Sequence, residues 1–155
     1  MLKIWKCALL GVLLTAPAVG RDLPATISGA GAVDVHVKVS HLRSAKGAVL
    51  ACITANPDRF PKCRDDTNAQ RAQIAAARAD EIIFHGVKPG RYAIAVLHDE
   101  NGNGKADRAI SMIPREGFGF SRDAKVSMGP PKFDEAAFSV RDADARMTIT
   151  MRYML

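Results

Sequence analysis

The sequence lacks a hydrophobic run long enough to cross a bilayer. Its longest apolar stretch, residues 7–14, is about half of the roughly 20 residues that a spanning helix needs. Two lysines precede the stretch and the small residues of 15–18 follow it, which is the pattern of a secretory signal. A lipobox is not predicted, because Cys7 stands before the run rather than after it. We therefore predict a cleavable signal peptide at residues 1–18, although a membrane anchor is the alternative.

Export places the mature chain in the periplasm or outside the cell, with no transmembrane segment after cleavage. The length that remains predicts one domain. Residues 19–31 are rich in glycine, proline and alanine and are expected to be a flexible leader. Residues 32–155 are expected to form the folded domain.

The sequence also lacks a cluster of basic residues. Its 22 lysines and arginines stand against 16 acidic residues, for a net charge of +6, and they are scattered along the chain. Loss of Lys3 and Lys6 with the signal leaves a mild basic excess. Nucleic acid is therefore not an expected partner, because a nucleic-acid site gathers basic residues on one face or stripe.

Cysteine is scarce, and its count changes on cleavage. The chain has three cysteines, of which Cys7 leaves with the signal. Cys52 and Cys63 remain in an oxidising compartment, so one disulfide is predicted, with two free thiols as the alternative. A metal site at this pair is not predicted, because the spacing is wrong and no histidine lies near in sequence.

Apolar and polar residues alternate along several short stretches, which predicts strands. Residues 33–39 alternate without a break, so their valines should face the core and Asp34, His36 and Lys38 should face solvent. Residues 48–54 are apolar on both faces, as expected for a central strand. Further strands are predicted at 82–84, 91–98, 136–140 and 147–153.

The alanine-rich residues 69–79 are ambiguous. Their composition favours a helical turn or two. The alternative is a strand around 73–77 that pairs with the next segment of the chain, and the strands on both sides favour this second interpretation. With it, about seven short strands predict a mostly β fold: a single antiparallel β-sandwich, immunoglobulin-like or transthyretin-like, with one long loop.

The long loop is expected at residues 99–131, where no periodicity is visible, and a loop of this length needs a reason. Its first part follows the opening half of a calcium loop, in which oxygens at alternate positions and a glycine in sixth place surround one Ca²⁺. The candidate ligands are Asp99, Asn101, Asn103, Asp107 and the Lys105 carbonyl.

The loop departs from the full calcium pattern at its twelfth position, where Ile110 replaces the bidentate glutamate. Weak affinity is therefore expected, and Ca²⁺ is the one cofactor that the sequence predicts. A plain turn is the alternative, because Asn-Gly pairs favour tight turns and Asp and Asn side chains bond their own backbone.

The second part of the loop carries two phenylalanines flanked by glycines. One interpretation is a recognition loop that presents Arg115, Glu116, Phe118 and Phe120 to an envelope protein, peptide or glycan. The other is that the two rings cap an open end of the core.

These loop motifs resemble the signature of one bacterial family. Residues 98–105 read HDENGNGK, residues 114–121 read PREGFGFS and residues 129–133 read GPPKF. Over about residues 33–153 the chain is similar to a family of exported proteins classed as a domain of unknown function. The resemblance implies a small periplasmic or secreted β domain. It brings no established activity, so no catalytic residue is carried over.

Catalysis is not predicted. His98 beside Asp99 is the best acid–base candidate, but neighbours on a strand point to opposite faces. The four histidines show no ligand spacing, although His85 and His98 would approach if their strands formed a hairpin. We expect a non-catalytic binding module, with a structural or accessory protein without a ligand site as the first alternative and a metal-dependent hydrolase as the weakest.

Overall fold

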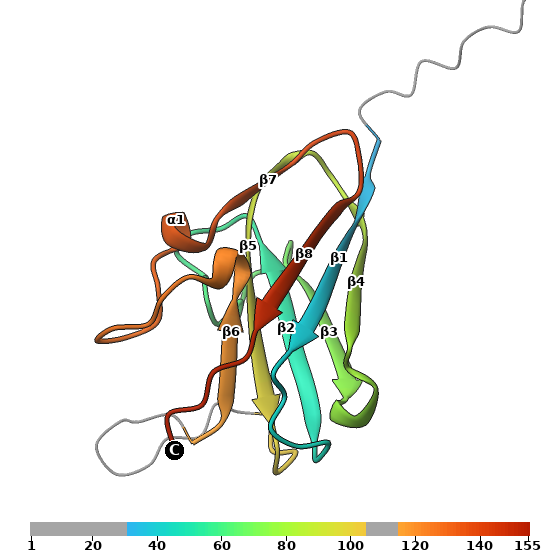
Figure 1. Cartoon of the computed structure of the whole chain (residues 1–155). Coiled ribbons are helices and arrows are strands. Elements are labelled where there is room, and N and C mark those ends of the chain that lie inside the picture. The colour runs from blue at the N-terminus through green and yellow to red at the C-terminus, as the bar shows by residue number, and fades with distance from the viewer. Residues whose placement is uncertain (1–30, 105–114) are drawn as a thin grey trace, which may run out of the picture.

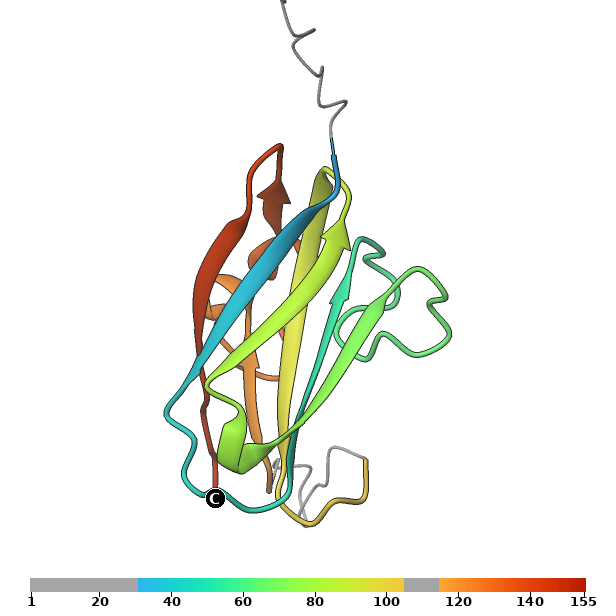
Figure 2. The same cartoon turned by 90° about the vertical axis from the view of Figure 1, so that its right-hand side faces the viewer.

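Strands dominate the computed structural model, which describes residues 31–104 and 115–155. The described residues form two sheets packed face to face, as Figures 1 and 2 show. The strands are β1 (Val33–Ser40), β2 (Ala48–Thr54), β3 (Gln70–Ala75), β4 (Glu81–Val87), β5 (Gly90–Asp99), β6 (Gly117–Phe120), β7 (Phe138–Val140) and β8 (Ala145–Thr150). Helix is limited, in these residues, to α1 (Phe133–Ala136) and the 3₁₀ turns Ala76–Arg78 and Ser121–Asp123. The mostly β, sandwich-like arrangement predicted from the sequence is confirmed.

The two sheets differ in size and order. One has three strands in the order β4-β1-β8, and the other has the order β3-β2-β5-β6, with β7 paired to the start of β5. The strand pairs are antiparallel except for β1 and β8, which run parallel. The central place of β2, between β3 and β5, agrees with its apolar residues on both faces.

The core between the sheets follows from the alternation along each strand. In β1, Val35 and Val37 are completely buried, whereas Lys38 is exposed on the outer face. Facing strands supply branched and aromatic side chains to the same core. The most deeply buried of these are Val49, Ile53, Ile82, Phe84, Ile94, Val96 and Ile149.

The alanine-rich segment forms a strand, but not at the residues or with the partner that the sequence indicates. The strand β3 ends at Ala75 and a 3₁₀ turn follows it. Its partner is the preceding strand β2 rather than the strand that comes after it, which joins the other sheet. The 3₁₀ turn therefore carries the chain from β3 in the larger sheet to β4 in the smaller sheet.

Residues 99–131 also contain a strand that periodicity did not reveal. The short strand β6 pairs with the second half of β5, from Ala95 to His98. Because glycine occupies every second position of β6, this strand lacks the usual alternation of apolar and polar residues. The predicted strand at 136–140 is likewise shorter, because residues 133–136 form α1.

The alternation of β6 is one of glycine and phenylalanine. A Cβ on Gly119 would lie 2.6 Å from the Ile149 Cγ2 atom, and one on Gly117 would overlap the Tyr153 ring. Only glycine lets the C-terminal chain approach so closely. That chain then bonds to β6, because Phe118 and Arg152 exchange backbone hydrogen bonds of 3.0 and 2.8 Å. One side of the sandwich is closed in this way.

The phenylalanine face of β6 builds a second apolar cluster on the outer face of the larger sheet. The residues after β6, with α1, cover this face in Figure 1. The cluster consists of Ala93, Phe118, Phe120, Ala124, Phe133, Ala136 and Ala137, with Phe60, Ala95 and Val126 packed against it. The β5–β6 side of the larger sheet is therefore buried on both faces, whereas Arg71 and Gln73 of β3 are exposed. In the described part of the chain, no helix is long and apolar enough to cross a membrane.

Replacing Gly119 by alanine tests the close approach of the C-terminal chain. The added Cβ would displace the Ile149 side chain, so we expect the free energy of unfolding to fall by about 1–3 kcal/mol in a denaturant titration. Gly129→Ala is the matched control, since nothing lies within 4 Å of a Cβ at that exposed position. Equal effects of the two substitutions would contradict the packing described for β6.

Candidate functional site

The end of β5 folds into a turn around the Asp99 carboxylate, which is 1% exposed. Its Oδ1 accepts hydrogen bonds from the backbone N–H groups of Gly102 and Asn103, at 2.8 and 3.2 Å. Its Oδ2 accepts one from the N–H of Gly104, at 2.7 Å. The Asn101 side-chain oxygen accepts another from Asn103, at 3.1 Å. A buried carboxylate is thus satisfied by the backbone that comes after it.

This geometry covers only the first half of the predicted calcium loop. The predicted ligands Lys105 and Asp107 lie outside the described residues, so the structure describes only Asp99, Asn101 and Asn103 of the predicted set. Within residues 31–104 and 115–155, no three His, Cys, Asp or Glu side chains are grouped to hold a metal. For the described half, the turn accounts for the position of Asp99, and calcium binding stays a prediction.

His98, next to Asp99 on β5, is completely buried and held on both sides. Its Nδ1 lies 2.7 Å from the Tyr153 hydroxyl and its Nε2 lies 2.9 Å from the Lys46 carbonyl oxygen. Because a carbonyl only accepts, Nε2 carries the proton in this arrangement. Both ring nitrogens are therefore used to join β5 to the β1–β2 loop and to the C-terminal segment.

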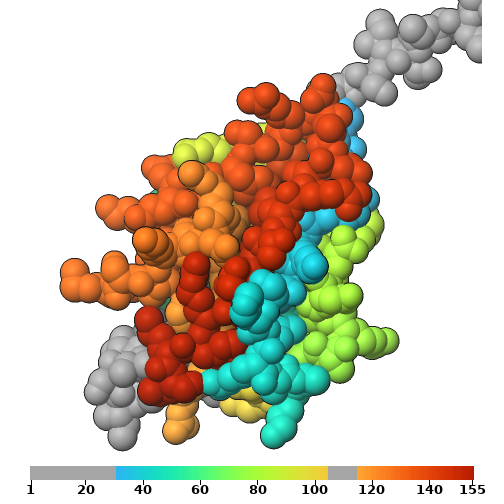
Figure 3. Space-filling view, in the orientation of Figure 1, coloured from blue at the N-terminus to red at the C-terminus, as the bar shows by residue number. Residues whose placement is uncertain are grey.

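Arg43 ties the same three segments together from the outside. Its guanidinium donates to Glu100 Oε2, at 3.0 Å from Nε, and to the Arg115 carbonyl, at 3.0 Å. It also lies over the Tyr153 ring, 4.5 Å from the centroid, and bonds to the carbonyl of Leu155. Figure 3 shows the β1–β2 loop and the C-terminal end side by side on this face.

The Arg43 pair changes the electrostatics of Glu100. The guanidinium, helped by the Ser44 hydroxyl at 2.6 Å from Oε1, lowers the pKa of Glu100 to about 2. Burial raises the pKa of the Tyr153 hydroxyl. Glu100 is thus held as a carboxylate and Tyr153 as a neutral hydroxyl near neutral pH. We call Arg43, His98, Glu100 and Tyr153 the lock.

The structure corrects the predicted recognition loop. Phe118 and Phe120 are only 9% and 5% exposed, and Glu116 is 4% exposed, whereas Arg115 is exposed. The two rings therefore do not present an aromatic surface. They do not cap an open end of the sandwich either, because β6 places them on the outer face of the larger sheet under the covering segment.

The two histidines whose approach would have allowed a metal site do not meet. Their strands belong to different sheets, so β4 and β5 form no hairpin ladder. His85 lies on the surface, where its Nδ1 is 2.8 Å from Asp34 Oδ2. His98 is enclosed in the lock.

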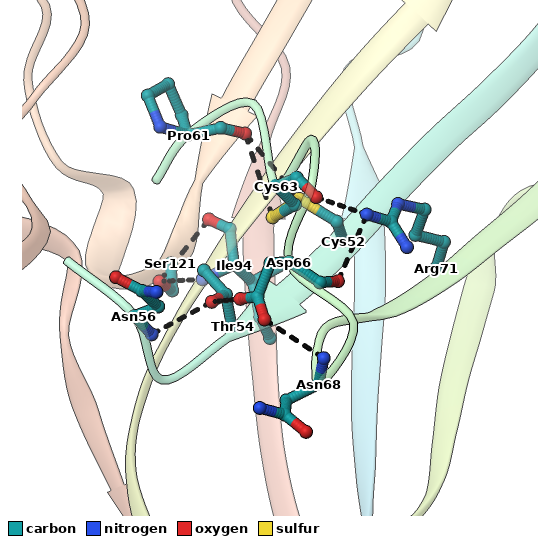
Figure 4. Close-up of a disulfide and its surroundings, with 10 residues drawn as sticks. All are labelled: Cys52, Thr54, Asn56, Pro61, Cys63, Asp66, Asn68, Arg71, Ile94 and Ser121. Carbon is teal, nitrogen blue, oxygen red and sulfur yellow. Dashed lines mark hydrogen bonds between the residues drawn. A yellow bond between two sulfur atoms is a disulfide. The ribbon is translucent and has the colours of Figure 1, made fainter. Parts of the chain in front are cut away.

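A disulfide joins Cys52 on β2 to Cys63, as the sequence predicts, and Figure 4 shows its surroundings. It fastens the loop of residues 55–69, which we call the stapled loop. The Arg71 guanidinium, from β3, donates to the Cys63 carbonyl and to the Asp66 carbonyl. The loop is thereby attached to both β2 and β3.

Thr54 and Asp66 hold the base of the stapled loop. The Thr54 hydroxyl donates to the buried Asp66 carboxylate and lowers its pKa below the usual value. It also accepts the Asn56 N–H at 2.9 Å, and Asp66 Oδ1 accepts the Asn68 N–H at 3.0 Å. Sequence reasoning missed this clamp, although an Asp shortly after the second cysteine, followed by Thr-Asn, is a signal for a side-chain-capped turn.

Phe60 anchors the tip of the stapled loop. Its ring packs edge to face against Phe120 and Phe133, with centroids 5.8 and 6.1 Å apart. The loop is therefore held at its base by polar bonds, in its middle by the disulfide and at its tip by the second apolar cluster.

The comparisons with known proteins identify a family without an activity. A family model described as "Uncharacterized protein conserved in bacteria (DUF2141)" matches residues 37–148, which is more than half of the chain. No curated protein and no solved structure gives a match.

Thermal melting with and without calcium tests the Asp99–Asp107 loop. We expect millimolar CaCl₂ to raise the melting temperature of the mature chain, and Asp107→Ala to abolish that rise, with MgCl₂ as the control cation. Asp99→Ala should lower the free energy of unfolding by about 1–3 kcal/mol even without calcium, because three backbone N–H groups lose their acceptor. An unchanged melting temperature in CaCl₂ would contradict calcium binding.

Proposed function

We propose that this chain, which belongs to the DUF2141 family of uncharacterized bacterial proteins, is exported and serves as a non-catalytic binding module of the cell envelope. The observation that carries the proposal is the Cys52–Cys63 disulfide and the loop it fastens. Disulfides persist in oxidising compartments and are rare in the cytosol of most organisms. This agrees with the signal peptide predicted at residues 1–18.

A non-catalytic role is supported by the lock, because its polar side chains are already hydrogen-bonded within the fold. A general base must reach a substrate proton. His98 is completely buried with both nitrogens bonded, and Glu100 is paired with Arg43. These side chains use their bonding capacity to hold three chain segments together.

A binding role is supported by the rigidity of the stapled loop. A loop that is already fixed loses little conformational freedom when a partner binds, so more of the contact energy remains as affinity. Its outer residues are charged and exposed, and they include both signs. They are Asp58, Arg59, Lys62, Arg64 and Asp65. An envelope protein, peptide or glycan is the expected class of partner.

Expression of the full chain in a bacterial host, followed by fractionation, tests both parts of the proposal. We expect the protein in the periplasm or medium, starting after residue 18, with no thiol that reacts under denaturing conditions. We also expect the immobilised mature chain to capture a component of envelope extract, and the double variant Arg59→Ala, Lys62→Ala to capture less.

The matched control is the double variant Lys38→Ala, Arg146→Ala, which removes two exposed cations from the outer face of the smaller sheet. It should capture as much as the natural chain. Two reactive thiols or a cytoplasmic location would contradict export. No capture, or equal capture by both variants, would contradict a binding role for the stapled loop and favour a structural protein.

A further inference from the structure

We infer that the end of the sandwich opposite the lock holds a saccharide site, in a hollow between the stapled loop and the β4–β5 turn. The inference rests on the proposed binding function and names the ligand class. The hollow has a volume of about 320 Å³, at the low end of the range for small-molecule sites. That space fits a single sugar unit of a glycan.

The hollow lies where β2 and β4 end and β3 and β5 begin. Its apolar floor is Ile53 of β2 and Val87 of β4, which are nearly completely buried. The Gln70 side chain of β3 bridges the sheets, because its Nε2 donates to the His85 carbonyl at 3.0 Å. The floor and the bridge come from elements of both sheets, so the hollow is part of the fold rather than of one loose loop.

An aromatic ring and several polar groups surround this floor. The half-buried Tyr92 lines the hollow from β5, and Asn68 and Lys88 line it from the two loops. Among the described residues, the structure gives no hydrogen-bond partner to the Asn68 amide group or the Lys88 ammonium. The Gln70 side-chain oxygen is likewise left for a ligand, since its bridge uses only the nitrogen.

This combination favours a saccharide over other ligand classes. A sugar presents C–H groups on one face, which pack on an aromatic ring and an apolar floor, and hydroxyls at its edge. Amide side chains both donate to and accept from hydroxyls, and an ammonium donates to them. A lipid chain offers no hydrogen-bonding groups to these side chains, and a metal cation would be repelled by Lys88.

The stapled loop positions one wall of the hollow. Asn68 is fixed through its backbone by Asp66, which is in turn clamped by Thr54 next to the disulfide. Figure 4 shows the Asn68 side chain pointing away from the disulfide. The polar network around Asp66 therefore fixes the backbone that carries Asn68, so that less ordering of the loop is left for the moment of binding.

Amide chemical-shift mapping of the ¹⁵N-labelled mature chain tests this site. The probes are glucose, N-acetylglucosamine and galacturonic acid, each titrated to high millimolar concentration. We expect at least one to shift the amide signals of Gln70, Val87, Lys88 and Tyr92 in a saturable way. We expect Asn68→Ala or Lys88→Ala to weaken that binding about tenfold, since each removes one hydrogen-bonding group from the site.

Gln73→Ala is the matched control, because this exposed glutamine lies on β3 outside the hollow. It should bind the sugar as the natural chain does. Tyr92→Leu keeps an apolar side chain in the core and should weaken binding without unfolding the domain. The absence of any saturable shift, or undiminished binding by Asn68→Ala and Lys88→Ala, would overturn the saccharide site. The capture test of the stapled loop uses other residues, so failure of the saccharide site can be told apart from failure of the proposed binding function.

Discussion

The alternation of glycine and phenylalanine along β6 is the constraint on which the rest of the structure depends. The two glycines let the C-terminal chain lie against β6 more closely than any Cβ would allow, which closes one side of the sandwich. The two rings lie in the cluster that covers the β5–β6 part of the outer face of the same sheet, and Phe120 packs against Phe60. Four residues thus connect the sandwich core, the covering segment with α1 and the tip of the stapled loop.

The two ends of the sandwich use polar residues in different ways. At the Asp99 end, the buried carboxylate accepts hydrogen bonds from the backbone that follows it, and the lock residues bond to one another and to nearby backbone carbonyls, so the end is fixed. At the opposite end, the clamp around Asp66 fixes the backbone of Asn68, whose exposed side chain lines the hollow. A site that binds a ligand needs both rigid support and bonding groups that the fold has not used. The second end provides this combination in the described residues.

Local patterns were sufficient to predict part of the structure. The strands β1, β2 and β5 follow from alternation and apolar runs, and the disulfide follows from the cysteine count after signal removal. The strand β6 could not be found in the same way, because its glycines are required by contacts with residues about thirty positions later in the chain. The lock is equally non-local, since Arg43 meets Glu100 and Tyr153 across separations of 57 and 110 residues. The segment around Phe118 and Phe120, which carries a sequence motif, is partly buried, because both rings lie in the second apolar cluster.

Amide hydrogen exchange at Phe118 and Arg152 tests the role of β6 most directly. These two amides donate to each other's carbonyl groups and join the C-terminal chain to the larger sheet. If β6 organises the fold as described, both should exchange as slowly as the amides in the middle of β5. Exchange as fast as that of Met128, which is fully exposed, would show that the C-terminal chain does not close on β6 and would contradict its organising role.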